Sequence, residues 1–174
     1  MKLILLLLIS MPAYSQAVWK YFSFENPHFT VEFPSKPQSK YKIIDTDLGQ
    51  IVVNTYYCAS SIDSTDNELY LINLYAIDES LFSGDSAISK LDYLNEMVNN
   101  IGSDLKSKEI YRNSVSEFEN PIITYRFENE KNSVVTKGKI QIINNWVFSL
   151  QVFTRKQFSL NKNMDRFLNS FYAR

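Results

Sequence analysis

The sequence predicts an α+β fold with a mainly antiparallel, twisted sheet. From residue 16 onward, short runs of β-branched and aromatic residues alternate with polar clusters, which favours strands. Residues 69–77 are apolar on both alternating faces apart from Asn73, which is typical of a central strand covered on both sides. Two later segments change to a helical period. Because a sheet with two buried faces needs packing above and below, these observations predict a further layer on each side of the sheet.

The first residues have the pattern of a secretory signal peptide. Lys2 precedes seven apolar residues, 3–9, and the small residues Ala13 and Ser15 suit cleavage before Gln16, with cleavage before Val18 as the alternative. A membrane-spanning helix needs about 20 apolar residues, so this run is too short to be a stable anchor. We therefore expect residues 1–15 to be removed and residues 16–174 to form one soluble domain, periplasmic or secreted. No cysteine lies near the junction to accept a lipid, so a lipid anchor is not expected.

Charge and cysteine content exclude several classes of function. The chain has 18 Lys and Arg against 19 Asp and Glu, which gives no electrostatic reason to expect nucleic acid or an anionic membrane as a partner. Cys58 is the only cysteine, so an intrachain disulfide is impossible. Its place in an apolar strand predicts a small buried side chain rather than a reactive thiol or a disulfide-linked dimer. We expect a monomer.

The first strands follow one another closely. Residues 29–33 alternate apolar and polar side chains, and Pro34 ends this strand. Residues 41–46 and 51–58 are predicted to form a hairpin, with Gly49 at positive φ in the connection 47–50. The polar segment 60–68 is predicted to be a loop.

The next element is an amphipathic helix over residues 86–101. Apolar residues recur there at spacings of three and four. Asp85 or Ser86 is the expected N-cap, and Gly102 is expected to end the helix.

Three strands and a second helix complete the chain. Residues 122–128 should place Ile123, Tyr125 and Phe127 inward. The C-terminal segment carries a helical stripe, and Ser159 or Asn161 can cap the start of that helix. The apolar stripe consists of Leu160, Met164, Phe167, Leu168 and Phe171.

Residues 134–143 and 146–153 form the strongest hairpin candidate. A two-residue turn would place Lys139 and Gln141 on the same face as the apolar side chains of the second strand. A three-residue connection, 143–145, instead aligns the apolar faces, with Asn145 in the left-handed conformation. We predict this second register, in which Ile142 pairs with Trp146, Ile140 with Phe148 and Gly138 with Leu150.

No motif in the sequence identifies a catalytic, cofactor or metal site. His28 is the sole histidine and is expected to face solvent before a strand, while the four glycines are too scattered to cradle a nucleotide. The acidic loop 63–68 lacks the spacing of a calcium loop. Two carboxylate pairs, Asp45 with Asp47 and Glu117 with Glu119, could serve a hydrolase but resemble ordinary surface charge. The aromatic cluster Trp19, Tyr21, Phe22 and Phe24 could form a ligand-binding edge, although packing of the N-terminal segment is favoured.

Four motifs along residues 19–172 resemble the exported bacterial domains of the PsbP-like fold. They are W-K-Y-F-S-F from Trp19, F-T-V-E-F-P-S-K-P from Phe29, T-D-L-G from Thr46 and R-F-L-N-S-F from Arg166. The resemblance implies an antiparallel sheet with helices packed on both faces, an α/β/α sandwich, and a non-enzymatic role in binding or assembly. It transfers no functional residue, because a shared fold does not give a shared function.

The sequence therefore favours a non-catalytic binding or accessory module of the bacterial cell envelope, with no cofactor. A second envelope protein or a hydrophobic small ligand would be its partner. A carrier of lipid or another hydrophobic ligand is the alternative, and a carboxylate-based hydrolase is the third hypothesis. The Pro34-x-x-Pro37 pair is interpreted as a strand terminator rather than a docking motif.

Overall fold

The computed structural model describes residues 18–46, 49–59, 67–83, 87–115 and 120–174. The expected signal peptide, most of the loop 60–68, the cap candidates Asp85 and Ser86, and the carboxylates Asp47, Glu117 and Glu119 lie outside these ranges. Cleavage before Gln16 and the organisation of residues 16–174 as a single domain stay predictions.

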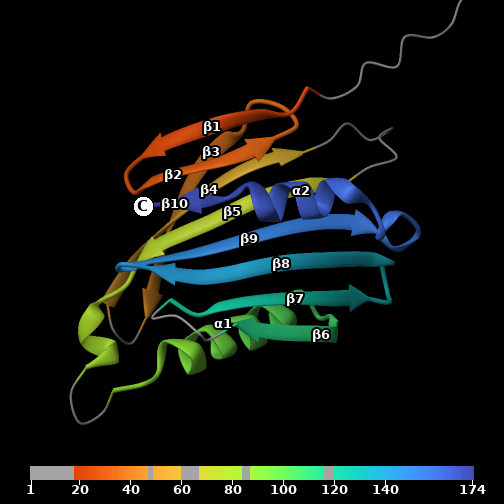
Figure 1. Cartoon of the computed structure of the whole chain (residues 1–174). Helices are drawn as coiled ribbons and strands as arrows, with labels where there is room; N and C mark the ends of the chain where they lie inside the picture. The colour runs from red at the N-terminus through yellow and green to blue at the C-terminus, as the bar shows by residue number, and fades with distance from the viewer. Residues whose placement is uncertain (1–17, 47–48, 60–66, 84–86, 116–119) are drawn as a thin grey trace, which may run out of the picture.

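Two antiparallel sheets make up most of the described chain (Figure 1). The seven-stranded sheet has the order β3-β4-β5-β9-β8-β7-β6, and the three-stranded sheet has the order β1-β2-β10. The first sheet consists of β3 (Gln38–Thr46), β4 (Gly49–Ala59), β5 (Leu69–Ala76), β6 (Lys108–Val115), β7 (Ile122–Asn129), β8 (Val134–Ile143) and β9 (Trp146–Arg155). The second consists of β1 (Lys20–Glu25), β2 (His28–Phe33) and β10 (Tyr172–Ala173), and the described helices are α1 (Lys90–Asp104), α2 (Lys162–Ser170) and the short 3-10 helices η1 (Glu79–Phe82) and η2 (Lys156–Phe158).

The seven-stranded sheet is buried from both sides near its centre. On β9, Phe148 belongs to a core shared with β2 and α2, whereas its neighbour Val147 belongs to a second core shared with α1, β7 and β8. The predicted antiparallel α+β class is confirmed. On the side of the large sheet where α2 lies, the small sheet provides most of the covering layer (Figure 1). The two α-helices among the described residues therefore form only part of the two helical layers expected from an α/β/α sandwich.

The early strands lie where the sequence predicts them. Pro34 follows directly on β2, and Gly49 has φ +111° at the start of β4. Cys58 is 6% exposed, as expected for a buried small side chain, and its Sγ lies 2.9 Å from Ser35 Oγ. Trp19, Phe22 and Phe24 pack against the core, and Phe24 stacks on Phe29 with ring centroids 4.5 Å apart. The packing interpretation is therefore confirmed for these three aromatic residues, whereas Tyr21 on β1 is 66% exposed.

The first long helix lies further along the chain than predicted. Ser89 is the N-cap and accepts a 3.0 Å hydrogen bond from the backbone N–H of Asp92, so residues 87–89 precede the helix. Gly102 does not end it but lies inside it, buried against Phe127. Lys106 takes the left-handed conformation at φ 49°, and Ser107 N–H donates to Gly102 O at 3.0 Å. This hydrogen-bond pattern ends helices without requiring glycine. Gly102 instead packs closely against Phe127, and a Cβ there would lie 2.9 Å from Cε1 of that ring.

The predicted register of the β8–β9 hairpin is wrong. Ile143 pairs with Trp146 across a two-residue turn, and Asn144 rather than Asn145 has positive φ, at 53°. The register was predicted on the assumption that one face of the hairpin is exposed to water. Both faces are buried, and the polar side chains of β8 interact with α2: Lys139 Nζ donates to Leu168 O at 3.4 Å.

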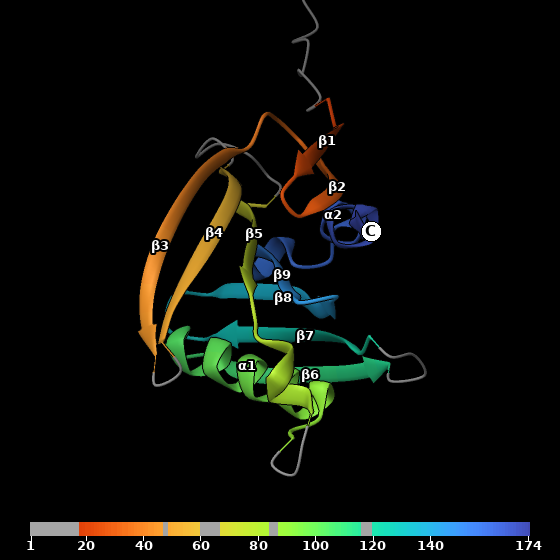
Figure 2. The ribbon, with the colours of Figure 1, turned by 90° about the vertical axis from the view of Figure 1, so that its left-hand side faces the viewer.

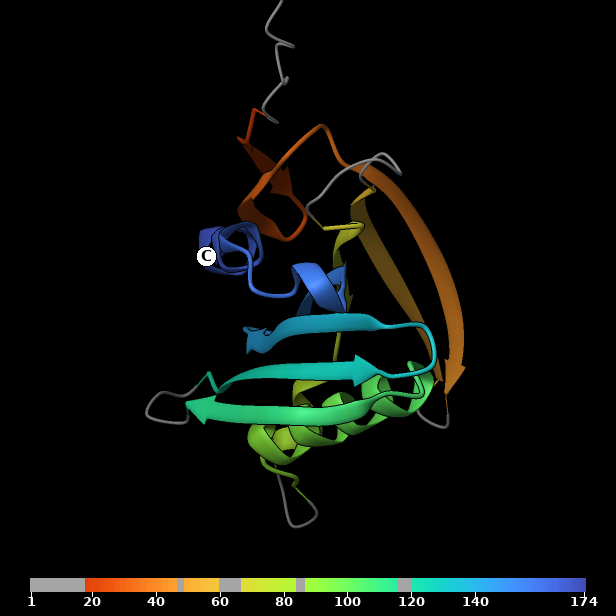
Figure 3. The same cartoon turned by 90° about the vertical axis from the view of Figure 1, so that its right-hand side faces the viewer.

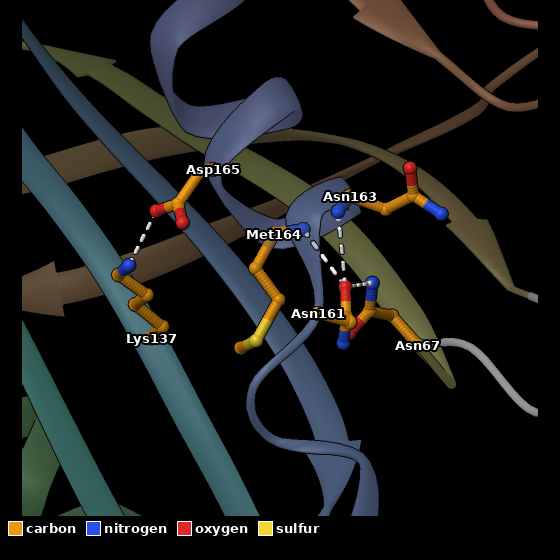
Figure 4. A network of polar contacts seen from close by, with 6 residues as sticks. All are labelled: Asn67, Lys137, Asn161, Asn163, Met164 and Asp165. Atoms are coloured by element: carbon orange, nitrogen blue, oxygen red, sulfur yellow. Dashed lines mark hydrogen bonds and ion pairs between the residues drawn. The ribbon is translucent and has the colours of Figure 1, made fainter.

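The C-terminal helix begins as predicted. Asn161 Oδ1 accepts 3.1 Å hydrogen bonds from the backbone N–H groups of Asn163 and Met164, and its side chain also binds Asn67 (Figure 4). Leu160, placed on the apolar stripe by the sequence, is instead 93% exposed before the helix. After α2 the chain forms β10, which pairs with β2 and which the sequence did not indicate.

Candidate binding groove

The β3–β4 hairpin extends past the end of β5. β5 pairs with β4 from Ala59 back to Asn54 and no further, whereas β3 continues to pair with β4 as far as Gly49. Residues 42–46 and 49–53, which we call the arm, therefore have each other as their only strand partners in the described part of the chain. The arm curves away from the sheet, and its tip lies beside α1 (Figures 2 and 3).

An apolar groove of about 560 Å³ separates the arm from α1 and is open to solvent. Ile44, Ile51 and Val53 lie on the inner face of the arm because they alternate along two paired strands. The opposite wall comes from β5, the η1 region and α1. It consists of Tyr75, Leu81, Ile88, Tyr93, Glu96, Met97 and Asn100. We call this feature the arm groove.

Two tyrosine hydroxyls supply polar atoms in the arm groove. Tyr75 Oη and Tyr93 Oη lie 3.2 Å apart, close enough for one to donate to the other. Burial raises the pKa of both phenols, and their mutual contact raises that of Tyr75 further. Both hydroxyls therefore stay protonated at neutral pH and can donate or accept hydrogen bonds. They do not act as bases.

The other described hollows are more polar. One of about 510 Å³ is lined by Glu68, Arg155 and Lys156 among others, and two of these side chains already form an ion pair, Arg155 Nε to Glu68 Oε1 at 2.8 Å. A hollow of about 270 Å³ beside α2 is lined by Lys137 and Asp165, which also pair with each other. These charges neutralise one another, so the arm groove is the hollow best suited to an apolar ligand.

The residues singled out by the sequence do not gather at the arm groove. His28 has a half-exposed side chain whose Nδ1 lies 3.6 Å from Glu25 Oε2, as expected for a solvent-facing histidine. Asp45 is exposed on the arm and accepts a 3.0 Å hydrogen bond from Gln50. Within the described ranges, there is no group of three or more His, Cys, Asp or Glu side chains that could hold a metal ion.

Sequence reasoning missed the groove because it underestimated the length of the hairpin strands. The predicted strands were residues 41–46 and 51–58. In the structure β3 and β4 have 9 and 11 residues, whereas β5 has 8, so some apolar residues of the hairpin extend past their neighbour. The sequence alone did not give the register that shows which residues these are. Separately, no described helix is both long and apolar enough to cross a membrane.

Comparison with solved structures identifies the fold. The chain is similar to cyanobacterial PsbP (CyanoP) from Synechocystis sp. PCC 6803, with a TM-score of 0.60 and 9% sequence identity over 96% of this chain and 99% of that one. The protein of unknown function PA94 from Pseudomonas aeruginosa is similar at a TM-score of 0.41 and 12% identity, over 83% of this chain and 88% of that one. No family model and no curated protein matches the sequence. The chain therefore has a PsbP-like fold, and at such identities the likeness extends to the fold alone.

Proposed function

We propose that this protein is a non-catalytic binding module, exported to the bacterial cell envelope, that holds an apolar part of a partner protein in the arm groove. The observation that carries the proposal is the groove itself. Apolar side chains from the arm and from α1 line its opposite walls and enclose a volume of about 560 Å³. The signal-peptide pattern of residues 1–15 supports export, and the PsbP-like fold is compatible with an accessory role.

The openness of the groove favours a protein partner over a carried small molecule. Binding sites for small ligands usually enclose most of the ligand surface, whereas this groove is open to solvent. A protein partner can cover the open side with its own surface. Glu96 is the only carboxylate among the described residues that line the groove, which speaks against a two-carboxylate hydrolase there.

The experiment uses immobilised protein to capture partners from envelope extracts, with two single-residue variants. Ile88→Glu introduces a charge at a groove residue that is 41% exposed, so the fold should tolerate it. Val115→Glu makes the same change at a 50% exposed residue on β6, outside the groove lining. We expect a partner that the wild type and Val115→Glu retain and Ile88→Glu loses. Identical capture by all three proteins contradicts the proposal.

The second candidate function is a carrier of a hydrophobic ligand with a polar group. It rests on the Tyr75–Tyr93 hydroxyl pair, which could bind such a group inside an otherwise apolar groove. Native mass spectrometry of the purified protein distinguishes the two. An added mass that disappears in Ile88→Glu but persists in Val115→Glu would favour the carrier, and a spectrum of unliganded protein alone would remove it.

A further inference from the structure

The outermost strand β3 offers a long edge to another chain. In the described part of the protein its only strand partner is β4, which pairs with it over all nine residues. Every side chain from Gln38 to Asp45 is exposed. A strand with one neighbour has unpaired backbone N–H and C=O groups along its other side, which can pair with a further strand.

The opposite edge of the same sheet is protected. The β6–β7 ladder has an irregularity between Glu109 and Tyr111, so β6 does not offer a regular template. Arg112 on β6 is also fixed to α1, through hydrogen bonds of 3.0 Å to Asn95 Oδ1 and 2.8 Å to Asn99 Oδ1. β3 has an uninterrupted register with β4 and no equivalent attachment to a helix among the described contacts.

The side chains of β3 define what a pairing strand would need. Tyr41 and Ile43, 72% and 51% exposed, lie on the face away from the arm groove. Lys40 and Lys42 lie on the other face, and neither forms an ion pair within the described residues. Residues directly opposite on paired strands share a face, so an incoming strand would meet apolar and basic side chains in alternation.

We propose that β3 binds an extended segment of a partner protein, which joins the sheet as an antiparallel eighth strand and alternates acidic with apolar side chains. Its acidic residues lie opposite Lys40 and Lys42, and its apolar residues lie opposite Tyr41 and Ile43. Backbone hydrogen bonds supply affinity, and the alternation supplies the register. This strand would be the binding segment of the partner protein in the proposed function. The proposal rests on that function only because it requires the partner to be a protein.

The test uses a labelled nine-residue peptide that alternates valine and glutamate, matched to the length of β3. Two control peptides have the same composition: one groups the valines and glutamates in blocks, and the other is N-methylated at alternate amides, which blocks pairing along one edge. We expect saturable binding of the first peptide alone. We also expect slower hydrogen exchange at β3 amides, a change that charge attraction without strand pairing does not produce.

Charge-reversal variants identify the surface that binds. Lys40→Glu combined with Lys42→Glu should weaken peptide binding about tenfold, because two favourable cross-strand pairs become repulsive. Lys20→Glu combined with Lys131→Glu makes the same net charge change at exposed residues elsewhere and should leave binding within about twofold.

Three results would overturn the inference: equal binding of the N-methylated peptide, equal loss in both double variants, or unchanged exchange at the β3 amides. Dimerisation without peptide that protects the same amides would also overturn it, because a second copy would then be the occupant of this edge. Ile88→Glu should still bind the peptide. Failure of the groove experiment and failure of the edge experiment can therefore be told apart.

Discussion

The centre of the seven-stranded sheet and the arm are built from similar alternating apolar residues but differ in how those residues are used. On β5, Tyr70, Ile72 and Leu74 are completely buried. On the arm, Ile43 and Val52 are 51% and 47% exposed. The difference arises from neighbouring elements. Central strands have strands on both sides and layers on both faces, whereas the two strands of the arm pair only with each other in the described part of the chain and face a half-open groove. Apolar residues stabilise the fold in the first region, and in the second they remain available for binding.

The largest effect should come from Gly138→Ala in the centre. A Cβ at residue 138 would overlap the ring of Tyr125, which is fully buried and lies on the neighbouring strand. We expect a loss of about 3 kcal/mol in the free energy of unfolding, measured by urea denaturation.

Gly102→Ala is the matched control for this change. Its new Cβ would lie 2.9 Å from Cε1 of Phe127, at the edge of a ring, and alanine favours the helix by about 1 kcal/mol. We expect a net change within about 1 kcal/mol. Similar losses in both variants would show that the contact between Gly138 and Tyr125 is not specially tight.

An intermediate and pH-dependent effect should come from Glu32→Gln, which removes the negative charge from the contact between the small sheet and α2. Arg166 donates hydrogen bonds of 2.6 and 3.1 Å to the Glu32 carboxylate, and these hold the pKa of Glu32 below its ordinary value of 4.5. The unfolded state therefore binds this proton more tightly than the folded state does. The pair stabilises the protein fully above about pH 4.5, and this contribution is lost as the pH falls through the lowered pKa.

Urea midpoints at pH 7 and pH 3 measure this dependence. We expect the wild type to have a higher urea midpoint than Glu32→Gln at pH 7, and we expect the difference between the two midpoints to be smaller at pH 3. Glu130→Gln, at an exposed carboxyl with no ion pair among the described contacts, should give no such convergence. A constant difference between wild type and Glu32→Gln at both pH values would contradict the assignment.

The smallest effect should come from Val52→Thr on the outer face of the arm. Threonine has nearly the shape of valine, and its hydroxyl can reach water at a residue that is 47% exposed, so we expect less than about 0.5 kcal/mol. The same change at Val147, which is completely buried, should cost about 2 kcal/mol because the hydroxyl is removed from water. Equal losses, measured by thermal or urea unfolding, would contradict the contrast between the centre and the arm.

Local sequence patterns predicted the antiparallel α+β class because alternation and helical period report which side chains are buried. Correct predictions include the strands around Phe29 and Ile123, the buried Cys58, and Asn161 as one of two candidate caps. In each case the signal lies within a few residues of the element itself. The resemblance to the PsbP-like fold was equally informative, because its motifs are structural.

Features set by distant neighbours could not be predicted in this way. The β8–β9 register depends on α2, which provides a carbonyl for Lys139 on a face that would otherwise meet water. The position of Gly102 inside α1 depends on Phe127 from another strand. The arm groove depends on where β5 stops pairing with β4. Each requires knowledge of which elements lie side by side.

The pairing of β10 with β2 makes completion of the fold a late event. Tyr172 pairs with Thr30, and Ser170 Oγ accepts a 2.9 Å hydrogen bond from Glu32 N–H across 138 residues of sequence. Contacts this distant raise the contact order, and forming them carries a large loop-closure entropy. A chain that emerges N-terminus first cannot complete its small sheet until its last residues are available. Its folding is therefore tied to the whole chain rather than to its N-terminal half.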